Sequence, residues 1–278
     1  MPGTEKAYKN LSFLNGPSSR QIRILCEYEE PQERFRHEKV RDTIVIFGSA
    51  RVKEPAIALR DFEHAKQNLA NADTDDAREH LTRALKQAER GVRISRYYAD
   101  TRELARLLTE WSMAREKKKK HFLICSGGGP GIMEAANRGA SDVPGGKSVG
   151  LGISLPFEEK VNQYVTPELA FEFHYFFMRK YWFAYLAKAM VIMPGGFGTM
   201  DELAEILTLR QTGKIKKPLP MVLFGKAYWD DVLHIDAMVE WGTIAEKDLT
   251  LMYRTDSVTE AFEFLTRELD LIELEDLR

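Results

Sequence analysis

The sequence predicts an α/β fold: a Rossmann-like doubly wound parallel sheet with helices on both faces and a helical insertion after the first strand. Continuously apolar runs recur along the chain and alternate with helical patterns, at residues 43–47, 121–125, 148–155, 190–193 and 220–224. Such runs are typical of strands buried on both faces of a parallel sheet. Two of these runs end in glycine-rich turns that open a helix, as in doubly wound nucleotide-binding folds.

Length and composition limit the organisation and the partners. The 278 residues fit one large domain with an appendage. We expect an N-terminal arm at 1–42, a single domain at 43–278, and an insertion of charged helices at about 53–93. Because 40 Lys and Arg residues balance 42 Asp and Glu residues, neither nucleic acid nor a membrane surface is an expected partner.

Local signals predict the compartment and the absence of metal chemistry. The N-terminus lacks the apolar segment of a secretory leader, and no apolar run has the roughly 18 residues of a membrane span, so we expect a cytoplasmic protein. Cys26 and Cys125 have no neighbouring residues at the spacing of a metal or redox motif. We therefore expect no metal and no cofactor.

Several further elements are predicted from periodicity and from helix breakers. Glu29-Glu30-Pro31 predicts a break in the arm, and Gly91 predicts the end of the insertion. The four lysines at 117–120, which follow Glu116, should complement the negative end of the preceding helix. The remaining expected elements are helices at 55–70, 76–90, 97–114, 171–188, 228–241 and 257–269, a loop at 156–167 and a strand near 249–253.

The stretch from Met190 to Gly213 predicts a strand, a glycine loop and a helix. Thr199 is a good N-cap residue, and the preceding glycines let backbone N–H groups approach an anion at the positive end of the helix. The loop is therefore interpreted as a phosphate cradle. Glu202 has two interpretations that the sequence leaves open: a capping-box glutamate bonded back to Thr199, or a carboxylate directed at the ligand.

A second glycine loop, at 126–131, also joins an apolar strand to a helix. One such loop is weak evidence for a ligand, because close packing of a strand and a helix also selects glycine. Two in one chain are stronger evidence. Neither has the GxxxxGK[ST] pattern of a P-loop or a clear GxGxxG dinucleotide fingerprint.

The segment 171–188 is unusually aromatic, with the sequence FEFHYFFMRKYWFAYLAK. It carries more aromatic surface than one helix can easily bury on one sheet, which predicts contact with a second chain in a homodimer or larger homo-oligomer. Arg179 and Lys180 need partners in such apolar surroundings. His174 is either catalytic or, more often in such a setting, structural. The insertion is either a lid or oligomer contact or, as we favour, a solvated structural addition.

Three motifs together resemble the LONELY GUY (LOG) family of "lysine decarboxylase-like" phosphoribohydrolases: SGGGPGIMEAAN at 126–137, FFMRK at 176–180 and PGGFGTMDE at 194–202. The resemblance covers roughly 43–269 without the insertion. It implies a Rossmann-like fold, an oligomer, and hydrolysis of the N-glycosidic bond of a nucleoside 5′-monophosphate to free base and ribose 5-phosphate. Plant members of the family act on cytokinin nucleotides, and bacterial members include general nucleotide nucleosidases.

The resemblance also implies roles for individual residues. Arg179 and Glu202 correspond to the catalytic pair. The expected phosphate and nucleotide site consists of Gly195, Gly196, Gly198, Thr199, Gly128, Gly129, Ser49, Met178 and Lys180. Two departures stand out: Asp201-Glu202 replaces the usual Glu-Glu, and Phe177-Met178 replaces more polar residues on the side expected to face the base. The preferred base, AMP-like or cytokinin-type, is thus left open.

The implied chemistry suits these residue types. A carboxylate such as Glu202 can stabilise an oxocarbenium-like transition state and take a proton from water, while Arg179 supplies a permanent positive charge. The alternative is a non-catalytic nucleotide-binding or molybdenum-cofactor-binding carrier of the same fold. A lysine decarboxylase would need a pyridoxal phosphate lysine in a recognisable setting, which the sequence does not offer. The expected partner is a small nucleotide.

Overall fold

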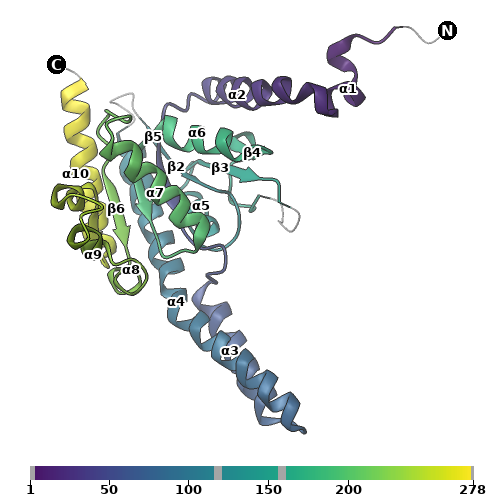
Figure 1. The fold of residues 1–278 in the computed structure, drawn as a ribbon, viewed down its shortest axis with the longest axis vertical. Coiled ribbons are helices and arrows are strands. Elements are labelled where there is room, and N and C mark those ends of the chain that lie inside the picture. The colour runs from purple at the N-terminus through teal and green to yellow at the C-terminus, as the bar shows by residue number, and fades with distance from the viewer. Residues whose placement is uncertain (1–3, 116–120, 156–160, 277–278) are drawn as a thin grey trace.

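Seven parallel strands form one sheet in the computed structural model, which describes residues 4–115, 121–155 and 161–276 (Figure 1). The strand order is β4-β3-β2-β1-β5-β6-β7. The strands are β1 (Asp42–Phe47), β2 (Phe122–Ser126), β3 (Ser148–Ile153), β4 (Ala170–Phe173), β5 (Ala187–Ile192), β6 (Met221–Phe224) and β7 (Tyr253–Thr255). The predicted doubly wound α/β fold is confirmed.

Helices cover both faces of this sheet. In chain order, the α-helices of the described residues are α1 (Leu11–Asn15), α2 (Arg20–His37), α3 (Pro55–Ala70), α4 (Asp75–Ala114), α5 (Ile132–Ser141), α6 (Phe176–Leu186), α7 (Phe197–Gln211), α8 (Lys226–Val232), α9 (Ile235–Glu240) and α10 (Val258–Asp276). Of these, α1 lies in the N-terminal arm and α3 in the insertion, away from the sheet. None of these helices, within the described ranges, is long and apolar enough to cross a membrane.

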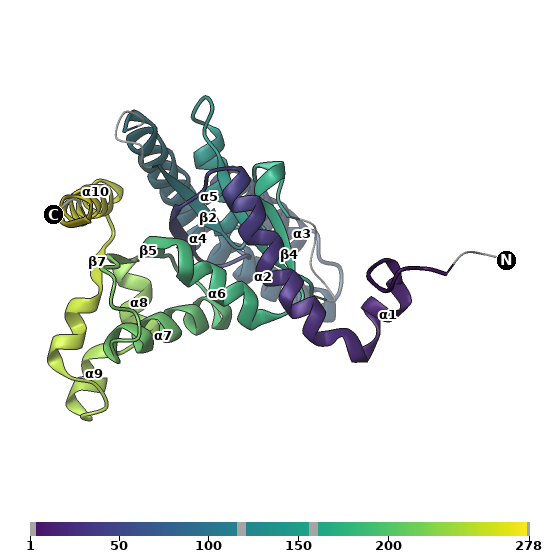
Figure 2. The ribbon, with the colours of Figure 1, turned by 90° about the horizontal axis from the view of Figure 1, so that it is seen from above.

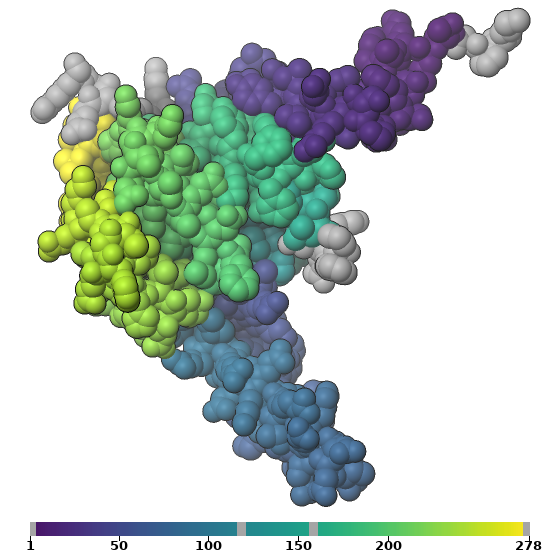
Figure 3. All heavy atoms as spheres, viewed as in Figure 1, coloured from purple at the N-terminus to yellow at the C-terminus, as the bar shows by residue number. Residues whose placement is uncertain are grey.

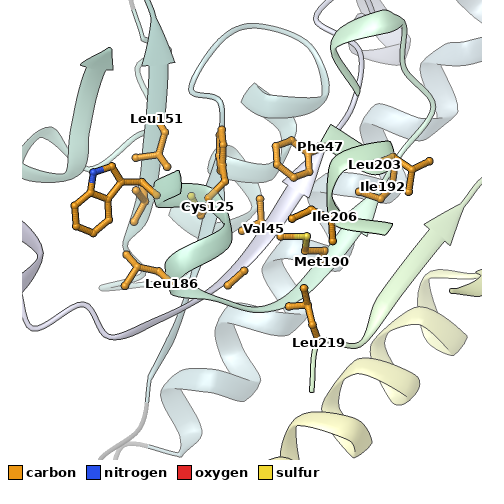
Figure 4. Close-up of a cluster of buried hydrophobic side chains, with 14 of the residues drawn as sticks. Val45, Phe47, Cys125, Leu151, Leu186, Met190, Ile192, Leu203, Ile206 and Leu219 are labelled. Carbon is orange, nitrogen blue, oxygen red and sulfur yellow. The ribbon is translucent and has the colours of Figure 1, made fainter. Parts of the chain in front are cut away.

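Alternate residues of β1 point into two separate hydrophobic cores. Val45 and Phe47 pack on one face with residues of α6 and α7, such as Leu203 (Figure 4). Ile44 and Ile46 pack on the other face with residues of α4, α5 and α10. Since both faces are covered, the central strands contain almost only apolar residues, which explains why their sequences are apolar without alternation.

The strand order reverses beside β1. From β1 the chain runs outward through β2, β3 and β4, and α6 then returns it to β5 on the other side of β1. In open α/β sheets ligands bind outside the carboxyl ends of the strands at such a switch point. Here the loops after β1 and β5 meet, because the Ser49 N–H donates to the Pro194 carbonyl at 3.0 Å.

Helix α2 runs through Pro31, so the predicted break at 29–31 is wrong. A proline inside a helix leaves the carbonyl four residues earlier without its usual donor, and here that carbonyl belongs to Glu27. The indole N–H of Trp182 donates to it at 3.0 Å. The helix therefore continues because a residue of α6 satisfies the carbonyl that Pro31 leaves unpaired.

The insertion is a hairpin of α3 and α4 that projects from the body of the molecule (Figures 1 and 3). Helix α3 has the predicted bounds, but α4 continues through Gly91 to Ala114, so the expected break at Gly91 is wrong. A glycine costs about 1 kcal/mol in a helix interior. This cost is too small to interrupt α4, a 40-residue helix whose second half is stabilised by packing on the sheet.

The aromatic segment and the C-terminal third also differ from expectation. Residues 171–188 were expected to be one helix, but they contain the end of β4, the whole of α6 and the start of β5. The helix expected at 228–241 is divided into α8 and α9, and α10 extends to Asp276. Strand β7 begins at Tyr253, the last residue of the strand expected near 249–253. The expectations for 116–120 and for 156–160 lie outside the described residues.

Candidate functional site

The loop between β5 and α7 is open at two of its three glycines. Gly196 and Gly198 are exposed, and a Cβ atom added to either would meet no other atom within 4 Å. Phe197 between them is 92% exposed. Because the first N–H groups of a helix have no partners within it, this open end of α7 is suited to bind an anion.

Helix α7 begins earlier than predicted. Its N-cap is Gly196, which places Thr199 at the third helical position, so the assignment of Thr199 as N-cap is wrong. The side chain of Thr199 instead lies against Gly195, where an added Cβ would overlap it. The capping-box interpretation of Glu202 is wrong for the same reason, since Glu202 is six residues after the cap (202 − 196).

Glu202 is a buried carboxyl facing two cations. It is 6% exposed, and its Oε1 atom has no hydrogen-bond partner. Arg179 Nη2 lies 3.9 Å from Oε1, and Lys180 Nζ lies 3.8 Å from Oε2. Burial raises the pKa of Glu202 to about 7, against the lowering effect of Lys180 and Arg179. A carboxyl with a pKa near neutrality can exchange a proton at physiological pH, as a general base must.

Arg179 is the nearer of the two cations to the aromatic surface. Its guanidinium lies over the rings of Phe176 and Phe183, at 5.1 Å and 5.8 Å from their centroids. Such faces attract a guanidinium and fix its plane. Helices α6 and α7 thus bring together the two residues, Arg179 and Glu202, that were predicted to be the catalytic pair.

Lys180 is held by carboxylates rather than open to a ligand. Its Nζ lies 2.6 Å from Glu205 and 2.8 Å from Asp201. Burial lowers the pKa of Lys180, but the bonds to Asp201 and Glu205 outweigh it and the net pKa is raised. The side chain therefore stays protonated and ties α6 to α7.

The loop between β2 and α5 is closed by its own packing. Gly128 and Gly131 have positive φ angles of 72° and 71°. A Cβ on Gly131 would overlap the Ser49 carbonyl oxygen, and one on Gly129 would lie 2.9 Å from the end of Met133. Gly128 is buried, and its N–H donates to the Ser126 hydroxyl at 3.0 Å. Gly128 and Gly131 are therefore needed for the backbone conformation and close packing of this loop, whereas the flexible end of Met133 could move away from a Cβ at Gly129.

The other predicted ligand residues have varied surroundings. Ser49 is half-buried, and its backbone joins the loops after β1 and β5 to the start of α5 through Ile132. Met178 is 7% exposed within the core, so of the two residues expected to face a base only Phe177, at 51%, lies at the surface. His174 is exposed and packs edge-on against Tyr175.

Sequence reasoning missed residues that support this site. Glu205 and Asp201 are four positions apart on α7, a spacing that places two side chains on one helix face and could have indicated a shared partner. Tyr228 donates its hydroxyl to the Gly195 carbonyl at 2.6 Å and braces the loop before α7. No local signal connects Tyr228 to that loop, because α8 brings it there.

Comparison with known proteins identifies relatives. Residues 133–265 match a family model described as "Possible lysine decarboxylase". Over 68 residues the chain is 40% identical to "Cytokinin riboside 5'-monophosphate phosphoribohydrolase LOG" of Oryza sativa subsp. japonica, covering 24% of this chain and 28% of the relative. Over these residues the chain is similar to LONELY GUY (LOG) proteins.

A second relative, "Probable cytokinin riboside 5'-monophosphate phosphoribohydrolase LOG6" of Arabidopsis thaliana, is 32% identical over 131 residues, covering 45% of this chain and 62% of the relative. The LOG7 protein of the same plant is 36% identical over 67 residues, which is 24% of this chain and 31% of the relative. The similarity thus spans less than two thirds of each relative. The match to the family model includes Arg179 and Glu202 and excludes residues 1–132.

Proposed function

We propose that this protein hydrolyses the N-glycosidic bond of a nucleoside 5′-monophosphate, giving free base and ribose 5-phosphate. One observation carries the proposal: Glu202 is a buried carboxyl with a pKa of about 7 that lies next to Arg179 of α6. Glu202 itself belongs to α7, whose open glycine end can bind phosphate. The relatives from Oryza sativa and Arabidopsis thaliana are named as phosphoribohydrolases, which supports the same reaction class.

In the proposed binding mode, the 5′-phosphate lies at the N-terminus of α7. The exposed backbone of Gly196 and Gly198 gives close access, and the helix dipole favours negative charge there. Tyr228 fixes the loop through the Gly195 carbonyl. Binding energy from the phosphate then positions the ribose for reaction.

In the proposed chemistry, the bond from the ribose C1′ atom to the base nitrogen breaks, and its electron pair leaves with the base. Ionised Glu202 stabilises the oxocarbenium-like C1′ and takes a proton from the attacking water, whose oxygen bonds to C1′. Arg179, 3.9 Å away, favours the ionised form of Glu202. Its permanent charge also stabilises negative charge on the departing base. The base takes up one proton to become the free base, and Glu202 releases the proton that it took from water.

A decarboxylase is less well supported despite the description of the family model. Pyridoxal phosphate chemistry needs a lysine that can become a neutral nucleophile. Lys180 is held in its charged form by two carboxylates. Lys217 has a pKa lowered to about 8 by burial, but its Nζ donates to the carbonyls of Ala184 and Tyr185, at the amino edge of the sheet.

The test is a panel of nucleoside 5′-monophosphates, AMP-like and cytokinin-type, each paired with its nucleoside. We expect base release from AMP and at least 100-fold less from adenosine, because the phosphate supplies the positioning energy. Chromatography of the released base measures both rates. Equal rates on AMP and adenosine would contradict the phosphate cradle, and tight nucleotide binding without base release would favour a non-catalytic carrier.

We also propose a homodimer or larger assembly in the cytoplasm. The aromatic side chains of Phe176, Phe177 and Tyr185 are all about half exposed on α6, an apolar surface that a second chain can cover. Light scattering at micromolar concentration measures the assembly. A monodisperse species of the chain mass, 31.9 kDa, would rule the oligomer out.

A further inference from the structure

Helix α2 contacts the start of the helix that carries Arg179. The Glu27 carboxylate accepts hydrogen bonds from the N–H groups of His174 at 2.8 Å and Tyr175 at 3.2 Å, directly before α6. The Tyr175 N–H, at the N-cap of α6, is one of the groups without a partner inside the helix, and a carboxylate there complements the positive end of the helix dipole. The side chain of Tyr175 makes no capping hydrogen bond, so Glu27 holds this end of α6 from outside the helix.

The same residue also holds the middle of α6. The Glu27 carbonyl, which Pro31 leaves unpaired within α2, accepts the indole N–H of Trp182. Trp182 is 2% exposed, with Tyr28 and Phe35 of α2 packed at ring-centroid distances of 5.9 Å and 5.3 Å. Figures 2 and 3 show α2 lying along the side of the molecule that bears α6.

Arg179 and Lys180 lie between these two anchored points, Tyr175 and Trp182. At the far end of α6, Lys217 donates to the carbonyls of Ala184 and Tyr185 at 2.9 Å. The helix is therefore held at its positive end by an acid and at its negative end by a base, both from outside it. Its position against α7 fixes the distances of both cations to Glu202.

We propose that Glu27 is a positioning residue for the Arg179–Glu202 pair: by capping α6 it holds Arg179 and Lys180 close to the Glu202 carboxyl. The inference rests on the proposed function for its catalytic meaning. It assigns a role to residue 27, which lies outside the family match at 133–265.

The position of α6 also affects the protonation of Glu202. The charged groups facing Glu202 are Arg179 and Lys180 from α6 and Asp201 and Glu205 from α7. If the start of α6 moves away, the two cations retreat while the two acids stay on the same helix as Glu202. The pKa of Glu202 then rises, and the acidic limb of the rate profile moves to higher pH.

The experiment compares Glu27→Ala and Glu27→Gln with Glu29→Ala and Glu29→Gln, which remove the same charge from an exposed position of the same helix. We expect Glu27→Ala to lower kcat for AMP about 10-fold, as loss of supporting contacts does at other sites, and to raise the pH of the acidic limb. Glu27→Gln keeps an acceptor oxygen and should recover most of the activity. The Glu29 variants should match the wild type in both measurements.

A merely structural role would lower activity only with the folded fraction, so thermal unfolding is measured on every variant. A fall in kcat with an unchanged acidic limb would overturn the inference. Should Glu27→Ala fail to fold, Glu27→Gln still tests the limb, because the neutral amide caps the helix more weakly than the carboxylate.

A second measurement separates this inference from the proposed function. Titration of the glutamate side-chain carbons by 13C NMR, with Glu202 assigned from Glu202→Gln, reports the pKa without turnover. If the wild type hydrolyses no nucleotide, the proposed function fails, but a higher Glu202 pKa in the Glu27 variants still supports the positioning role. An unchanged Glu202 pKa would overturn it whether or not the protein is active.

Discussion

The loop after β2 and the loop after β5 each leave a buried strand and enter a helix at the same edge of the sheet, but their glycines have different neighbours. In the first loop, a Cβ on Gly131 would overlap the Ser49 carbonyl, and Gly128 is buried with a positive φ angle. In the second, Gly196 and Gly198 face open space.

This comparison distinguishes two physical reasons for a glycine between a strand and a helix. In the closed loop, glycine lets two backbones approach each other, so its absence should be felt in folding. In the open loop, no protein atom requires glycine at positions 196 and 198, so the space beside them is available to a ligand. Similar glycine-rich sequences therefore have a structural role in one loop and a proposed binding role in the other.

The largest expected effect is on the closed loop. Gly131→Ala should lower the free energy of unfolding by about 3 kcal/mol or more, because it combines a positive φ angle for a residue with Cβ and a clash with backbone. Denaturant titration measures the loss. Gly91→Ala in α4 is the control, since its Cβ meets nothing, and it should stabilise by up to about 1 kcal/mol. A Gly131→Ala protein as stable as the wild type would remove the distinction between the loops.

The next effect concerns the carboxyl beside the open loop. Glu202→Gln should lower AMP hydrolysis by about 100-fold or more, since an amide can neither accept the proton from water nor stabilise positive charge. The substitution keeps the shape of the side chain, and no cap is lost, because α7 is capped at Gly196. Steady-state rates at pH 8 check the effect, and turnover near the wild-type level would exclude Glu202 as the catalyst.

The same variant also tests the buried charge through stability. The pKa of Glu202 is raised from 4.5 to about 7 in the folded protein, so the folded state binds the proton more tightly than the unfolded chain. Stability from this group is therefore present below about pH 4.5 and declines as pH rises to about 7, by on the order of 3 kcal/mol. Glu202→Gln should lack this decline in melting curves recorded from pH 5 to 8. Parallel curves for both proteins would contradict a buried, perturbed carboxyl.

Much of the fold could be predicted from the sequence because its signals are local. Apolar runs and glycine turns locate five strands and both loops. Strand β4 was missed, since Phe171 and Phe173 begin an aromatic stretch that looks helical, and only pairing with β3 makes it a strand. The course of α2 through Pro31 depends on a donor from Trp182, far along the chain.

In the candidate site, too, some features follow from local sequence and others depend on residues far along the chain. The resemblance to the LONELY GUY family predicted Arg179 and Glu202 as a pair, and in the structure they lie 3.9 Å apart. Whether Glu202 belongs to a capping box depends on where α7 begins. Its N-cap is Gly196, three residues before Thr199, so the start of the helix does not follow the cap propensity of Thr199. The engagement of Lys180 and the role of Glu27 depend on partners from other elements, so no pattern around either residue predicts them.

The smallest expected effect gives the sharpest contrast between the loops. Gly198 is the second residue of α7, and an alanine there has room for its methyl group and a better helix propensity. Gly198→Ala should therefore raise the free energy of unfolding by up to about 1 kcal/mol. In the nucleotide complex the same methyl group would occupy space that the phosphate needs, and overpacking of this size weakens AMP binding by about 10-fold.

Melting temperature and calorimetric Kd for AMP, measured on the inactive Glu202→Gln background, separate the two effects. If Gly198→Ala makes the protein more stable but weakens AMP binding, the space beside Gly198 serves ligand binding and not folding. Unchanged affinity for AMP would show that the phosphate does not approach α7 at Gly198.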